Sequence, residues 1–148
     1  DRDRLEIYRG TLNMIRHHPV IGVGINTFRL EFPGYKVHET KPYSVKGDWY
    51  AHNIFLHTAG EIGLTGMLVF LWLLFRIFRY WALGDRHVSG DAFTCTCSLG
   101  IQAGILAFLV NGITESNLYY TQIAHFFWFA MGLSIGVIGQ SRKTAESI

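Results

Sequence analysis

Three long apolar stretches occupy the second part of the chain and predict membrane-spanning helices at about 54–75, 93–113 and 123–139. Crossing a bilayer takes about 20 apolar residues, and each stretch is long enough. The last two stretches contain no Lys, Arg, Asp or Glu. This pattern favours an all-α integral membrane protein over the buried bundle of a large soluble protein.

The charges that flank these stretches predict their orientation. Basic residues lie between the first two spans and after the third: Arg76, Arg79, Arg86, Arg142 and Lys143. The loop between the second and third spans has Glu115 and no Lys or Arg. Because basic loops stay in the cytoplasm, residues 142–148 are expected to form a cytoplasmic tail. Residues 1–53 then face the outside, which means the periplasm if the cell is Gram-negative.

The first 53 residues follow a different pattern, that of an amphipathic helix followed by a loop. Apolar side chains recur at helical spacing and predict a helix over residues 3–16: Leu5, Tyr8, Leu12 and Ile15. Pro19 should end this helix near His18. Gly22 and Gly24 then permit a tight turn, and residues 30–51 read as irregular.

Composition sharpens this division. Of the 148 residues 49% are apolar and only 16% are charged, where about 25% charged is usual. Disordered, collagen-like, disulfide-rich and coiled-coil classes are excluded, and a net charge of +2 is too small to imply a nucleic-acid partner. The chain lacks an initiator Met and a signal-peptide pattern. We therefore expect a C-terminal fragment of a longer protein, with further membrane helices upstream.

Aromatic residues are scattered among the charges of the irregular segment and leave two interpretations open. These residues are Tyr35, Tyr43, Trp49 and Tyr50. They could line a sugar-binding site, or they could form the aromatic belt that marks the headgroup level of a membrane. The pattern alone favours the belt slightly.

Polar residues with possible chemistry gather where the outer segment meets the first span. Asn53, His57 and Glu61 are spaced i, i+4, i+8 and share one helix face. His52 and His57 are five residues apart and do not converge, so a zinc site of the H-E-x-x-H kind is not expected. A carboxylate within a span is costly in lipid, so Glu61 should face protein or water.

The groups expected on the outer side suit one kind of reaction. They include Arg4, Arg9, Arg16, Arg29, His38, His52 and Glu115. Arginines bind pyrophosphate through charge-assisted bonds, and a histidine can accept a hydroxyl proton. Transfer from a lipid pyrophosphate to an alcohol would use both. The alternatives are solvated arginines and packing histidines in a non-catalytic membrane protein, or a transporter fragment. The apolar midplanes of the spans argue against transport.

The order of short motifs along the chain resembles the O-antigen ligase family, which includes O-antigen polymerases and protein O-oligosaccharyltransferases. The motifs are Arg4-Leu5-Glu6-Ile7-Tyr8, His18-Pro19-Val20-Ile21-Gly22-Val23-Gly24, His52-Asn53-Ile54-Phe55-Leu56, Glu61-Ile62-Gly63-Leu64-Thr65-Gly66 and Thr114-Glu115-Ser116. The resemblance implies a polytopic helical bundle of the GT-C glycosyltransferase type. It also implies a multi-pass protein of the bacterial inner membrane with its active site facing the periplasm. Tyr8 stands where the family usually has Trp.

The resemblance further implies a reaction and its residues. A glycan would move from undecaprenyl pyrophosphate to an acceptor hydroxyl without a metal or other cofactor. Arg4 matches an arginine tied to the donor pyrophosphate, and His52 matches the proposed base. Residues expected to bind substrate or support the site are Asn53, Glu61, Arg29 and Glu115. Lipid A-core is the first choice of acceptor, as in lipopolysaccharide biosynthesis of the cell envelope; a growing glycan or a protein is the alternative. Since a further family arginine lies in an earlier loop, the fragment alone is expected to be inactive.

Overall fold

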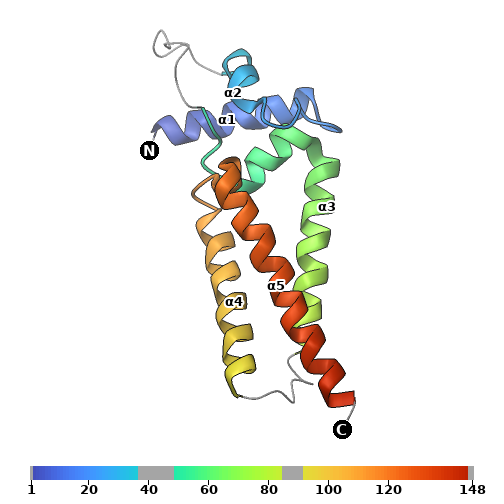
Figure 1. Ribbon diagram of the computed structural model, residues 1–148. Coiled ribbons are helices and arrows are strands. Elements are labelled where there is room, and N and C mark those ends of the chain that lie inside the picture. The colour runs from blue at the N-terminus through green and yellow to red at the C-terminus, as the bar shows by residue number, and fades with distance from the viewer. Residues whose placement is uncertain (1, 37–48, 85–91, 147–148) are drawn as a thin grey trace. The chain divides into compact units, whose positions relative to one another are not determined.

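The computed structural model describes residues 2–36, 49–84 and 92–146. Over these residues the chain is helical and contains no strand, which confirms the all-α prediction. The elements are α1 (Arg2–His17), α2 (Phe28–Glu31), the 3₁₀ helix η1 (Phe32–Tyr35), α3 (Ile54–Gly84), α4 (Ala92–Asn111), the 3₁₀ helix η3 (Asn117–Tyr119) and α5 (Thr121–Glu146). Figure 1 labels the α-helices. The predictions that involve His38, Tyr43 and Arg86 lie outside the described residues.

The chain divides into two compact units. Unit 1 consists of Asp1–Phe70 and Asn111–Tyr120, and unit 2 consists of Leu71–Val110 and Thr121–Ile148. Three helical stretches are long and apolar enough to cross a membrane: Ile54–Leu83, Ala92–Asn111 and Thr121–Gly139. The three spans predicted from the hydrophobic pattern are therefore present as helices, and the protein is a multi-pass membrane protein.

Buried polar groups of unit 2 are paired, both between helices and within one helix. Trp81 Nε1 donates to Ser134 Oγ at 3.2 Å, and that hydroxyl donates to the Met131 carbonyl at 2.7 Å. On α4, Gln102 Nε2 donates to Ser98 Oγ at 3.0 Å. An unpaired polar group is costly inside a bilayer, so these contacts allow polar residues to lie within apolar spans.

Helix α1 of unit 1 is amphipathic, but its buried face differs from the predicted one. Leu5 and Leu12 are 55% and 46% exposed, whereas Thr11 and Met14 are completely buried. Thr11 can be buried because its hydroxyl donates to the Ile7 carbonyl at 2.7 Å. The predicted face was therefore wrong at two of its positions.

The core that α1 covers comes from residues far apart in the chain. Met14 of α1 packs in one buried cluster with Phe28, Phe32 and Ala51. Phe28 and Phe32 stack with ring centroids 5.3 Å apart. The segment over residues 30–51 was expected to be irregular, and this was wrong for residues 30–35. They continue α2 and form η1, because Phe28 and Phe32, four residues apart, bury the same face.

Helix α3 is interrupted at Gly63, whose φ of 71° and ψ of −179° lie outside the helical region. The break frees backbone amide and carbonyl groups on both sides of Gly63 for other partners. The segment over residues 19–24 forms hydrogen bonds with them. The amides of Val23 and Gly24 donate to the Gly60 and Glu61 carbonyls at 3.0 and 2.9 Å. The motif His18–Gly24 therefore acts as a backbone partner for the broken helix.

The other side of the break is held by the same segment. The Leu64 amide donates to the Pro19 carbonyl at 2.8 Å, and the Thr65 hydroxyl donates to the Val20 carbonyl. The expected turn at Gly22 and Gly24 is confirmed, with φ of 71° and 115°. After the break, residues 64–83 remain, which is roughly 30 Å of helix and enough to cross a bilayer without the preceding turns.

Candidate functional site

Arg4, Glu115 and His52 meet in unit 1 although they come from three distant parts of the chain. Arg4 Nη2 donates to Glu115 Oε1 at 3.2 Å, across 111 residues of sequence. The other oxygen, Oε2, lies 3.5 Å from His52 Nδ1. One carboxylate thus faces the guanidinium and the imidazole together. The sequence predicts all three as site residues, and the structure brings Arg4 and His52 to the same carboxylate.

The His52 ring faces the Glu115 carboxylate with its Nδ1 atom. Nδ1 is buried and has no hydrogen-bond partner among the described residues, so the Glu115 oxygen is the acceptor that it faces. When Nδ1–H points at a carboxylate, the lone pair lies on Nε2, which can then accept a proton.

The backbone at His52 is held in an uncommon conformation. Its φ of 46° is left-handed, a region that residues other than glycine rarely adopt. The Tyr8 hydroxyl of α1 donates to the His52 carbonyl at 3.2 Å. Backbone strain of this kind persists where the surroundings fix the residue, and here α1 supplies one of the fixing contacts.

Asn53 fixes the next position by capping α3. Its Oδ1 accepts from the amides of Phe55 and Leu56, both at 2.9 Å, which satisfies two free donors at the helix start. Its Nδ2 donates to the Ile113 carbonyl at 2.9 Å, and its own amide donates to Ser116 Oγ at 3.2 Å. Asn53 therefore ties the start of α3 to the two sides of Glu115 in the 113–116 loop.

Glu61 belongs to a separate, buried pair with His57. His57 Nε2 lies 3.4 Å from Glu61 Oε1, and that oxygen accepts the Phe28 amide at 3.3 Å. The His57 ring stacks on Phe28 with centroids 4.6 Å apart. Glu61 thus faces protein, as its cost in lipid required. Together these contacts fasten α2 to α3 rather than joining the Arg4–Glu115–His52 cluster.

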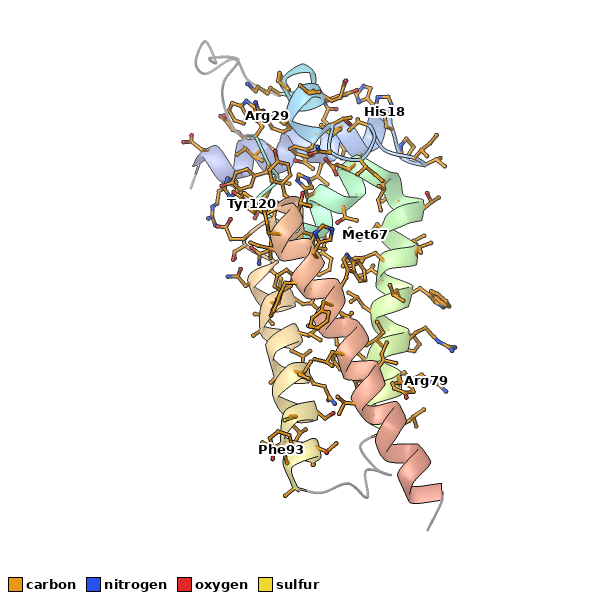
Figure 2. The ribbon with its side chains drawn as sticks, viewed as in Figure 1. His18, Arg29, Met67, Arg79, Phe93 and Tyr120 are labelled. Carbon is orange, nitrogen blue, oxygen red and sulfur yellow. The ribbon has the colours of Figure 1, made fainter. Side chains whose placement is uncertain are left out.

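Two further sequence predictions concern Arg29 and metal binding. Arg29 is exposed on α2 (Figure 2) and directly follows Phe28, whose amide donates to Glu61. Within the ranges 2–36, 49–84 and 92–146, no group of three or more His, Cys, Asp or Glu residues could hold a metal ion.

One tyrosine lies against the His52 ring, and two more that the sequence does not predict pack behind it. The Tyr50 ring lies 4.2 Å from the His52 ring, and Tyr119 stacks on Tyr50 at 6.1 Å. Tyr120 packs edge-on against Tyr119 at 5.5 Å. Tyr119 and Tyr120 follow the Glu115 loop directly, and that adjacency was the available signal.

Burial raises the pKa of Tyr50, and the neighbouring Tyr120 and Glu115 raise this pKa further. Part of that effect comes from a hydrogen bond between the side chains of Tyr50 and Tyr120. Tyr50 therefore stays neutral at physiological pH, with a phenol beside the imidazole and the carboxylate.

The comparison with protein families gives a clear result for the first part of the chain. Residues 1–71 match the O-antigen ligase family model. The match confirms the resemblance over these residues, which include Arg4, the His18–Gly24 motif and His52–Asn53. The matched range ends at residue 71, where α3 passes from unit 1 into unit 2. Glu115 and the tyrosines after it therefore lie outside the matched range. Searches of curated proteins and of solved structures found no match.

Proposed function

We propose that this protein is part of a membrane glycosyltransferase that moves a glycan from undecaprenyl pyrophosphate to an acceptor hydroxyl at the periplasmic side of the inner membrane. The observation that carries the proposal is the contact of Arg4 and His52 with one carboxylate, Glu115. The O-antigen ligase match supports it, because it covers both Arg4 and His52.

Arg4 supplies positive charge for the leaving group. Its side chain is 43% exposed, although Nη2 is paired with Glu115. A guanidinium presents several donors in one plane and can bind a carboxylate and a phosphate oxygen together. As the bond to the pyrophosphate breaks, charge develops on the phosphate oxygen, and Arg4 stabilises that charge.

His52 acts on the acceptor. Its Nε2 accepts the proton of the acceptor hydroxyl while the hydroxyl oxygen forms a bond to the anomeric carbon of the donor sugar. The bond from that carbon to the phosphate oxygen breaks, and undecaprenyl pyrophosphate leaves with the electron pair. Glu115 holds the ring through Nδ1 and stabilises the imidazolium that forms, as a carboxylate does for a histidine base in other enzymes.

The acceptor that we propose first is lipid A-core, and a growing glycan or a protein hydroxyl is the alternative. The test uses the full-length protein in membranes, an undecaprenyl-pyrophosphate glycan and each of the three acceptors. Transfer should persist in EDTA, because Arg4 supplies the cationic charge. A wild-type protein that transfers glycan to no acceptor would refute the function.

Variants with matched controls test the two roles. His52→Asn tolerates the left-handed backbone better than His52→Ala does, so its effect reports on the imidazole. Loss of a general base should reduce transfer by roughly 10²–10⁴-fold. Arg4→Gln should also lose most transfer. The controls are His17→Asn and Arg9→Gln, which alter exposed residues of α1 and should retain transfer. Normal transfer by His52→Asn would exclude His52 as the base.

A further inference from the structure

We infer that Tyr50, Tyr119 and Tyr120 form a binding subsite for a pyranose ring, namely the sugar attached directly to the donor pyrophosphate. The inference rests on the proposed function and names the part of the substrate that this face of the site recognises. It also decides, for Tyr50, between the two interpretations that the sequence left open for its aromatic residues.

The first step of the argument is position. The Tyr50 ring lies against the His52 ring, with centroids 4.2 Å apart and planes tilted by 45°. A reacting atom must come within about 3–3.5 Å of its catalytic partner. The acceptor oxygen that His52 deprotonates lies between the imidazole and the anomeric carbon, so the donor sugar begins about two such distances from His52. On the Tyr50 side of the imidazole, that sugar meets an aromatic ring.

The second step is exposure. Tyr120 is 47% exposed, although its ring packs edge-on against Tyr119. Tyr119 is partly buried between Tyr50 and the buried His57, which it meets at 5.3 Å. The cluster is thus anchored on its inner side, while Tyr120 keeps a free surface. A tyrosine offers a large, rigid contact surface with a polar end and loses little conformational freedom on binding.

The third step is the polar surroundings. The Tyr120 hydroxyl, the Glu115 carboxylate and the Arg4 guanidinium all act electrostatically on Tyr50, and the guanidinium and the carboxylate are themselves paired at 3.2 Å. A sugar ring has apolar C–H faces and a rim of hydroxyls, so it fits flat aromatic rings bordered by hydrogen-bonding groups. A membrane belt needs an aromatic ring at the headgroup level but gives no reason for that ring to lie against an imidazole.

The experiment compares two ligands that differ only in the sugar. Binding of the undecaprenyl-pyrophosphate glycan and of glycan-free undecaprenyl pyrophosphate is measured on the full-length protein, together with KM for donor and acceptor. Tyr120→Leu should weaken glycan-donor binding by roughly 5- to 10-fold and leave glycan-free binding unchanged. Tyr120→Phe keeps the ring and should have a smaller effect.

The control is Phe126→Leu, because Phe126 is 70% exposed on the first turns of α5 and is not part of the cluster. This variant should bind both ligands as the wild type does. Three results would overturn the inference: equal weakening for both ligands, which indicates membrane anchoring; a change in acceptor KM alone; or no change. Binding is measured without turnover, so failure of transfer and failure of the subsite are distinguishable.

Discussion

Replacing Gly63 by alanine should destabilise unit 1 far more than an ordinary Gly→Ala substitution. Gly63 has φ +71° and ψ −179°, a combination that is essentially restricted to glycine and costs other residues about 1–3 kcal/mol. A Cβ at this position would lie 2.2 Å from the Val20 carbonyl oxygen, inside van der Waals contact with a backbone atom. Relieving that overlap adds about 1–3 kcal/mol, which gives a total cost of about 2–6 kcal/mol.

The assay is thermal unfolding of the full-length protein in detergent. Gly34→Ala is the matched control, because Gly34 also lies in unit 1 and a Cβ there meets nothing within 4 Å. Gly63→Ala should lower Tm by roughly 5 °C or more, and Gly34→Ala should change it little. A Gly63→Ala variant that melts like the Gly34→Ala variant would refute the reasoning.

A second glycine tests whether the two segments act as one unit. A Cβ at Gly22 would lie 2.4 Å from the Glu61 carbonyl carbon, so Gly22→Ala disturbs the same backbone contact from the other side. Once one substitution has separated the segments, the other has less left to disrupt. The double variant should therefore lose less stability than the sum of the single variants. Simple additivity would show that the two glycines act independently.

Three more measurements probe the surroundings of the site. Asn53→Ala should lower the free energy of unfolding by about 1–2 kcal/mol through loss of the helix cap; Asn53→Asp keeps the capping oxygen and should lose less. Phe28→Ala, which empties the centre of the unit 1 core, should cost about 3–5 kcal/mol in the same melting assay. Because the pKa of Tyr50 is raised, the folded state disfavours the phenolate, so this contribution to stability is present below the ordinary tyrosine pKa and is lost as pH rises above it. Tyr50→Phe should therefore show a smaller loss of stability at alkaline pH, and an unchanged pH profile would contradict the assignment.

The fold was predictable to the extent that its signals are local. Long uncharged runs identify membrane helices because lipid excludes charge, and Pro19 marks the end of α1 because its ring cannot continue a helix. The buried face of α1 was less predictable. Thr11 is buried because its hydroxyl has a partner within its own helix, and Leu12 is exposed; neither fact follows from hydrophobicity alone.

For the candidate site too, short motifs predict which residues belong to it but not how these residues contact one another. Arg4 and His52 were identified by short motifs, and Glu115 by its place in an outer loop. Their shared contact depends on a pairing across 111 residues, which no local pattern contains. The tyrosines after Glu115 were missed for the same reason, since only the fold brings Tyr119 beside Tyr50.

The break in α3 and the cap at Asn53 explain why His52 can hold a defined position at the end of a short helix. The turns that precede Gly63 are tied at one end to the Gly112 carbonyl, which accepts the Ile54 amide at 2.7 Å. They are tied at the other end to the 19–24 segment. An isolated helix of about two turns is unstable in water, so the tertiary contacts at both ends must supply its order. The contacts that order these turns, and so position the His52 imidazole, therefore require glycine at position 63. Loss of the backbone hydrogen bonds beside Gly63 would disturb His52 even if Arg4, His52 and Glu115 were unchanged.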